Sequence, residues 1–90
     1  MIDAQPLQGR HVLLVEDSMI IAMDAEDALK EIGAAKVVVA ASVARALGAL
    51  EKGGLNFALL DLNLGEETSL PVADMLAKNN IEAGVVQSKI

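Results

Sequence analysis

The chain has 90 residues and a formal net charge of −6, and its hydrophobic residues include one Phe and neither Tyr nor Trp. This length suits one small domain, whose core must therefore be aliphatic. The absence of cysteine excludes disulfides and thiolate chemistry, and the acidic balance argues against a nucleic-acid or anionic-membrane surface. Because no apolar run is long enough to cross a bilayer and the first residues lack a signal-peptide pattern, we expect a soluble cytoplasmic domain.

Residues 1–10 contain Pro6 and Gly9 and are expected to form a flexible leader before a single domain spanning 11–90. Within that domain, short apolar runs that end in a polar or glycine-containing break are typical of buried strands. The predicted strands are 12–15, 37–39, 57–60 and 84–87.

The first predicted helix begins at Asp17 or Ser18, either of which can cap it, and ends near Gly33. Acidic and basic residues occupy the face opposite its apolar stripe, as expected for a helix that packs on a sheet. The stripe predicted to face inward is Ile21, Ala25, Ala28, Leu29 and Ile32.

Two further helices are predicted from capping and terminating residues. Ser42 caps the second helix, which Gly53 and Gly54 end, and Thr68 or Ser69 begins the third, which the pair Asn79-Asn80 ends. The inward residues of these two helices are predicted to be Val43, Leu47, Leu50, Val72, Met75 and Leu76. Strands that alternate with helices in this way indicate a parallel α/β sheet of about four strands, covered on both faces.

Acidic residues follow two of the predicted strands directly. Glu16 and Asp17 come after the first strand, and Asp61 comes after the third. The carboxyl ends of parallel strands are where an α/β sheet forms its ligand crevice, so we expect the three carboxylates to converge. At about 5 Å and an effective dielectric near 20, each pair would repel by roughly 3 kcal/mol. Water and a hard divalent cation relieve such crowding.

With these features, the chain resembles the receiver domain of two-component response regulators. The segment 12–18 is similar to the first strand and acidic pair of that family, and 57–65 is similar to its third strand, phosphoacceptor aspartate and following loop. The resemblance covers residues 11 to about 82. It implies a flavodoxin-like sheet of order 2-1-3-4 with three helices, which lacks the fifth strand and last helices of the family because the chain stops at Ile90.

The resemblance also implies roles for particular residues. Asp61 would accept a phosphoryl group from a histidine of a sensor kinase or phosphotransfer protein. Glu16, Asp17 and Asp61, with the backbone carbonyl of Asn63, would hold Mg²⁺. The domain would act by changing partners and not as an enzyme that turns over a substrate.

The chain departs from the family at its C-terminal end. Gln87 occupies the position of the hydroxyl residue that contacts the phosphoryl group, with Ser88 one place later, and Lys89 is the nearest replacement for the family's lysine. We therefore expect Mg²⁺ binding to survive and phosphorylation to be impaired. The exposed edge of the last strand is expected to drive homo-oligomer formation.

Two rival functions remain open. One is a non-phosphorylated interaction or decoy module that dimerises or competes for a sensor kinase. The other, less favoured, is a Mg²⁺-dependent phosphatase or transferase that uses Asp61, which lacks a second acid two residues further on because Asn63 stands there. Met19 and Met23, which follow the acidic pair, are expected to take part in helix packing and not to act as ligands. Asp24, Glu26 and Asp27 are expected to form a solvated helix face.

Overall fold

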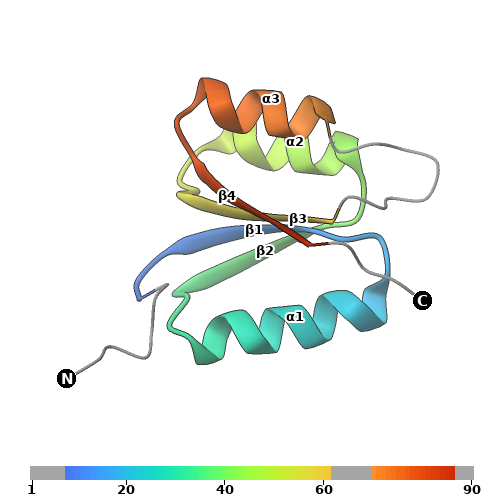
Figure 1. Ribbon diagram of the computed structural model, residues 1–90, viewed down its shortest axis with the longest axis vertical. Helices are drawn as coiled ribbons and strands as arrows, with labels where there is room; N and C mark the ends of the chain where they lie inside the picture. Colours follow the sequence, from blue (N-terminus) through green and yellow to red (C-terminus); the bar gives the residue numbers. More distant parts are fainter. Residues whose placement is uncertain (1–7, 62–69, 87–90) are drawn as a thin grey trace.

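The computed structural model describes residues 8–61 and 70–86, in which strands and helices alternate (Figure 1). The elements are β1 (His11–Val15), α1 (Met19–Glu31), β2 (Lys36–Ala40), α2 (Val43–Lys52), β3 (Phe57–Asp61), α3 (Leu70–Lys78) and β4 (Glu82–Val86). None of the helices in the described ranges is both long and apolar enough to pass through a membrane.

The four strands form one parallel sheet in the order β2-β1-β3-β4. This is the flavodoxin-like order expected from the sequence. Val15 of β1 pairs with Ala40 of β2 on one side and with Leu60 of β3 on the other. The strands therefore end together at one edge of the sheet, and that edge carries the acidic residues.

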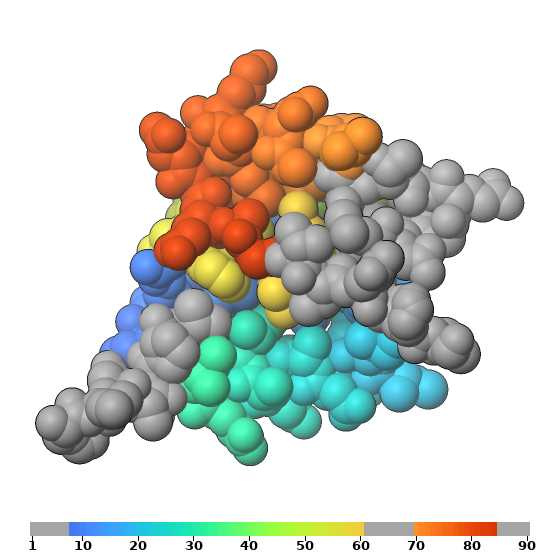
Figure 2. Space-filling model, in the orientation of Figure 1, coloured from blue at the N-terminus to red at the C-terminus, as the bar shows by residue number. Residues whose placement is uncertain are grey.

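Helices cover both faces of the sheet: α1 lies on one side, and α2 and α3 lie on the other (Figures 1 and 2). Adjacent residues of β1 point to opposite faces and divide the core into two clusters. Val12 and Leu14 belong to the cluster under α1, whereas Leu13 and Val15 belong to the cluster under α2 and α3. All four side chains are at most 2% exposed, as expected for a parallel strand with both faces covered.

The predicted helix caps are confirmed where the structure describes them. The Ser18 hydroxyl accepts a hydrogen bond from the backbone N–H of Ile21 at 3.4 Å, and the Ser42 hydroxyl accepts one from Arg45 at 3.2 Å. Gly33 follows α1 with a φ of 107°, a conformation that strains any residue with a Cβ. The chain thus leaves each helix where the sequence indicates.

Two sequence-based assignments are wrong in detail. The last strand begins at Glu82 instead of Gly84, and its described part ends at Val86. On α1, Ala28 is exposed, while Ala22 is 1% exposed and takes its place in the core. The inward stripe therefore runs through Ala22, Ala25 and Leu29, at helical spacings of three and four residues.

Two residues of the expected leader contact the domain. The Gly9 N–H donates to the carbonyl of Gly33 at 2.9 Å, and the Arg10 carbonyl accepts from Ala35 at 2.8 Å. Residues 1–7 of that leader lie outside the described residues, as do Thr68 and Ser69, the expected start of the third helix.

Candidate functional site

The sheet register brings the two acidic strand ends to neighbouring positions. Val15 and Leu60 are paired in adjacent parallel strands, so Glu16 and Asp61, the next residue on each strand, follow at the same edge. Asp61 also pairs through its main chain with Val86 of β4. The backbone therefore places Glu16 and Asp61 at neighbouring strand ends, while the Asp61 side chain lies outside the described parts of the structure.

Glu16 is held firmly by main-chain hydrogen bonds and is 2% exposed. Its N–H donates to the carbonyl of Ala40 at 3.0 Å, which continues the β1–β2 pairing by one residue. Its Oε2 accepts a hydrogen bond from the N–H of Ser18, also at 3.0 Å. The carboxylate is consequently fixed in the turn between β1 and α1.

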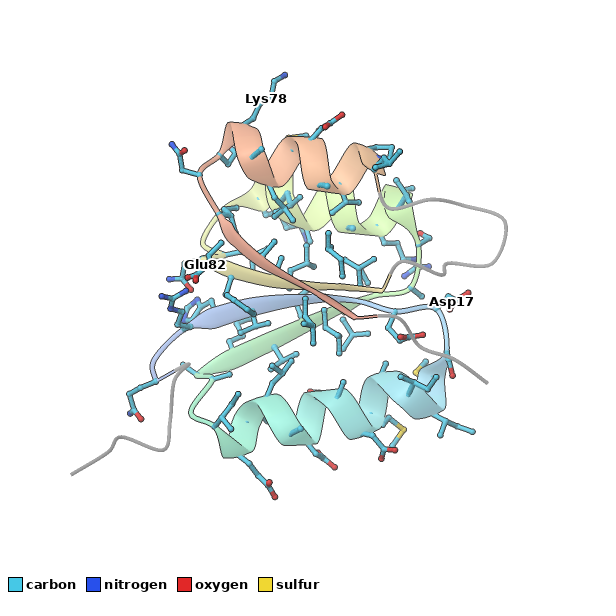
Figure 3. The ribbon with its side chains drawn as sticks, in the orientation of Figure 1. Asp17, Lys78 and Glu82 are labelled. Atoms are coloured by element: carbon cyan, nitrogen blue, oxygen red, sulfur yellow. The ribbon has the colours of Figure 1, made fainter. Side chains whose placement is uncertain are left out.

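Asp17 lies between Glu16 and the helix cap Ser18, and its side chain is exposed. Figure 3 shows Asp17 at the end of the sheet opposite to Glu82, which begins β4. The edge thus presents one buried and one exposed carboxylate, both oxygen ligands suited to a hard cation. Among the residues whose side chains are described, no group of three or more His, Cys, Asp or Glu could hold a metal ion, and that set does not include Asp61.

A pocket of about 300 Å³ opens beside this edge, between α1 and the end of β2. Its lining combines three acids with apolar residues and one arginine: Glu16, Asp17, Glu26, Met19, Ala22, Met23, Val39, Ala41 and Arg45. Glu26 is paired with Lys30 at 3.3 Å. The charge pattern of α1 predicts a solvated position for Glu26, and no sequence pattern marks Arg45 as a site residue. Residues 19, 22, 23 and 26 share one helical face, and that spacing could have identified the wall of the pocket.

The first turns of α1 expose large apolar side chains beside the acidic pair. Met19 is 69% exposed, Ile20 is 76% exposed and Met23 is 60% exposed. The prediction that Met19 and Met23 take part in helix packing is therefore wrong. The reason is that the small Ala22 and the more distant Leu29 fill the buried side of α1, which turns both methionines toward solvent.

The other predicted site residues cannot be placed. Asn63, the expected source of a backbone carbonyl, and Gln87, Ser88 and Lys89, the expected phosphoryl contacts, all lie outside the described residues. Of the predicted site residues, the structure thus describes Glu16 and Asp17 fully and Asp61 through its main chain.

No protein-family model and no curated protein matches this chain. Among solved structures, the chain is similar to SdrG from Sphingomonas melonis Fr1, with 34% identity, a TM-score of 0.78, and 91% of this chain and 86% of that chain covered. It is also similar to the BeF3-activated conformation of SdrG from Pseudomonas melonis Fr1, with 34% identity, a TM-score of 0.72, and coverage of 89% and 84%.

A third similar structure is the Saccharomyces cerevisiae phosphotransfer protein Ypd1 in complex with the receiver domain of the response regulator Ssk1. The identity is 21% and the TM-score 0.66, with 90% of this chain and 62% of that chain covered. At this identity the likeness shows the fold alone. Together with the sheet order and the SdrG match, the strand-end acids identify the family. The chain belongs to the receiver domains of two-component response regulators.

Proposed function

We propose that this domain accepts a phosphoryl group on Asp61 and so relays a two-component signal. The observation that carries the proposal is the register of β1 with β3, in which the pair Val15 and Leu60 is followed on both strands by acidic residues. In the reaction, a carboxylate oxygen of Asp61 attacks the phosphorus of a partner's phosphohistidine. The P–N bond breaks as the P–O bond forms, and the electron pair of the broken bond stays on the imidazole nitrogen.

The residues present fit Mg²⁺, because they offer carboxylate oxygens at one open edge of the sheet. Glu16 and Asp17 would hold the ion, together with Asp61 and the backbone carbonyl of Asn63. When bound, Mg²⁺ supplies positive charge that offsets the negative charge of the phosphoryl oxygens. The buried position of Glu16, fixed by the N–H of Ser18, supports a site whose shape exists before the ion arrives.

The exposed apolar residues of α1 support a docking role for this end of the domain. Met19, Ile20 and Met23 adjoin the acidic edge, and apolar side chains grouped on a surface commonly mark a protein contact. The proposed partner is a sensor histidine kinase or a phosphotransfer protein. The Ypd1 complex, in which a phosphotransfer protein binds a receiver domain, supports that class of partner.

Phosphorylation is proposed to be impaired, because Gln87 stands where the family has a hydroxyl residue. Val86 pairs with Asp61 across β3 and β4, so Gln87 is the next residue in the chain after the partner of the acceptor. The same observation favours the alternative function, a decoy module that binds a kinase without being phosphorylated.

A homo-oligomer through the β4 edge is the remaining part of the proposal. In the described residues β4 pairs with β3 on one side and with no other strand, and an open edge favours association. Sedimentation at high micromolar concentration tests it, and a monomer there would count against the contact.

Titration with Mg²⁺, followed by amide chemical shifts, tests the metal site. Asp17→Asn and Asp61→Asn should each weaken Mg²⁺ binding at least about tenfold, which is about 1.4 kcal/mol. The matched control is Glu31→Gln, which removes an exposed acid from the last turn of α1, at the other end of the helix. Equal affinity in all four proteins would rule out the site.

Labelling with acetyl phosphate separates the two candidate functions. A phosphoacceptor gains the mass of one phosphoryl group, and Asp61→Asn abolishes the gain. Replacing Gln87 by Thr should lengthen the lifetime of the label. If the wild-type protein is never labelled but still binds a kinase, the decoy function is correct and the phosphoacceptor function is wrong.

A further inference from the structure

A second pocket, of about 530 Å³, lies along the outer edge of β2, beside α2. We call it the β2 groove. Its lining comes from β1, β2, α2 and the loop after α2: His11, Lys36, Val38, Val39, Arg45, Gly48, Ala49, Lys52, Gly53, Gly54 and Leu55. Glu16 and Asp17, the acidic site residues whose side chains the structure describes, do not line it, although Val39 and Arg45 border both pockets.

The β2 groove gathers positive charge in an acidic protein. Among the residues whose side chains are described, Lys36, Arg45 and Lys52 line it and no Asp or Glu does, although the chain as a whole carries a net charge of −6. In the part of the chain that the structure describes, these three cations form no ion pair, whereas Arg10 is paired with Glu82 and Lys30 with Glu26. The groove is therefore electrostatically complementary to an anionic partner.

The cations stand at both ends of the groove, with apolar residues between them. Lys36 is the first residue of β2, and Lys52 is the last residue of α2. The loop that follows Lys52 lies against His11 at the start of β1, where the Nδ1 of His11 is 3.2 Å from the carbonyl oxygen of Gly54. Arg45 lies in the first turn of α2, which is at the opposite end because the helix runs back along the sheet between parallel strands. The charge spacing suits an elongated partner.

The main chain of β2 leaves hydrogen-bonding groups at this edge. The Lys36 N–H donates toward the carbonyl of Arg10, and the Ala40 carbonyl accepts from Glu16, so these alternate residues face β1. The residues between them, Val37 and Val39, direct their N–H and C=O groups outward. Among the described residues, no strand pairs with that side of β2. An extended peptide could add there as a further strand.

Gly48 keeps the helical wall of the groove open. It lies inside α2, where glycine is unfavourable relative to alanine. A Cβ added to it would meet no atom within 4 Å. A larger side chain at this position would therefore occupy the groove without disturbing the packing of the helix.

We propose that the β2 groove binds an extended acidic segment of a partner protein, which pairs with the outer edge of β2. Side chains of an added strand alternate between the two faces of the sheet. Those on the α2 face meet Lys36, Arg45 and Lys52, so acidic residues belong at every second position. This surface meets the pocket beside the α1 docking region at Val39 and Arg45, and its binding does not depend on phosphorylation of Asp61.

The test uses a seven-residue, end-capped peptide in which threonine and glutamate alternate, with binding followed by amide chemical shifts of the full chain. Shifts are expected to be largest at Val37 and Val39. Replacing glutamate by glutamine in the peptide should weaken binding at least tenfold through loss of charge. Replacing the central threonine by proline should weaken it similarly, because proline lacks the N–H that a strand needs.

Protein variants provide the matching controls. Lys36→Glu and Lys52→Glu should each weaken peptide binding at least tenfold, and Gly48→Leu should block it by filling the groove. Lys78→Glu makes the same charge change on α3, where Figure 3 shows Lys78 projecting away from the sheet, and should leave binding within twofold of wild type. None of these residues belongs to the proposed Mg²⁺ site, so Mg²⁺ affinity separates failure here from failure of the phosphoacceptor function.

Three outcomes would overturn the proposal. The first is equal weakening by Lys78→Glu, which would show attraction to charge in general. The second is binding of inorganic phosphate or a nucleotide in the groove with no binding of the peptide, which would make it a small-anion site. The third is self-association that Lys52→Glu abolishes, which would make a second copy of the chain the occupant.

Discussion

The contact between Arg10 and Glu82 offers a direct test of where β4 begins. The Arg10 guanidinium donates to Oε1 of Glu82 at 2.8 Å, although the two residues are 72 positions apart in the sequence. It also lies 5.9 Å from the centre of the Phe57 ring. Arg10 precedes β1 and Glu82 begins β4, so the contact crosses β3, which lies between them in the sheet. The perturbation is a double-mutant cycle of Arg10→Ala and Glu82→Ala.

The expected energies follow from exposure. The two side chains are 36% and 66% exposed, and ion pairs this open to water contribute about 0.2–1 kcal/mol. The guanidinium over the Phe57 ring adds about 0.5–1 kcal/mol. We therefore expect Arg10→Ala to lower the free energy of unfolding by about 1–1.5 kcal/mol and Glu82→Ala by about 0.5 kcal/mol. The coupling energy between the two substitutions should be about 0.5 kcal/mol.

The assay is urea unfolding followed by circular dichroism, because the chain contains neither Trp nor Tyr for fluorescence. The coupling should shrink in 1 M NaCl, where the Debye length falls to about 3 Å. Zero coupling at low salt would refute the register that places Glu82 at the start of β4. A coupling above about 2 kcal/mol would refute the assignment of the pair to the solvent-exposed class.

Two substitutions in the body of the domain test its packing by the same unfolding assay. Gly48→Ala should raise the free energy of unfolding by about 0.5–1 kcal/mol, since its new Cβ meets no atom within 4 Å; a loss of stability would mean that α2 is packed more tightly there. Leu13→Ala should lower it by about 3 kcal/mol, because the side chain is 0% exposed between the sheet and the helices α2 and α3. A loss below 1 kcal/mol would show that Leu13 does not lie in the core.

Much of the fold follows from local patterns that the sequence makes explicit. The run 12–15 is apolar at every position, which is the pattern of a strand buried on both faces. The serines at 18 and 42 each precede an amphipathic segment and do cap the helices. The predicted start of β4 is two residues late because Glu82 and Ala83 have low strand propensity. The ion pair of Glu82 with Arg10, which is distant in the sequence, is not visible in a local pattern.

The candidate site was also predictable in part from local sequence patterns. Glu16 and Asp17 directly follow a recognisable strand, so their position at the sheet edge follows from the chain direction. The exposure of Met19 and Met23 did not follow, because methionine is usually counted as a core residue and the small Ala22 carries little hydrophobic signal. The β2 groove is lined by side chains from β2 and α2, which are separate in the sequence. No local sequence pattern predicts that these side chains lie side by side.

The two clusters of the core are unequal in size, and the two faces of the sheet are therefore expected to differ in local stability. In the described residues, the buried cluster beneath α1 consists of Val12, Leu14, Ala22, Leu29 and Ala34. Outside the strands it contains one leucine, Leu29, and two alanines, Ala22 and Ala34. The cluster beneath α2 and α3 includes Leu50, Val72 and Leu76. Because α1, among the described elements, packs on the sheet without a neighbouring helix, whereas α2 and α3 also pack against each other, the amides of α1 should be the first to exchange with solvent when the native state fluctuates. The helix that borders the acidic edge is thus also the helix expected to open locally at the lowest free energy.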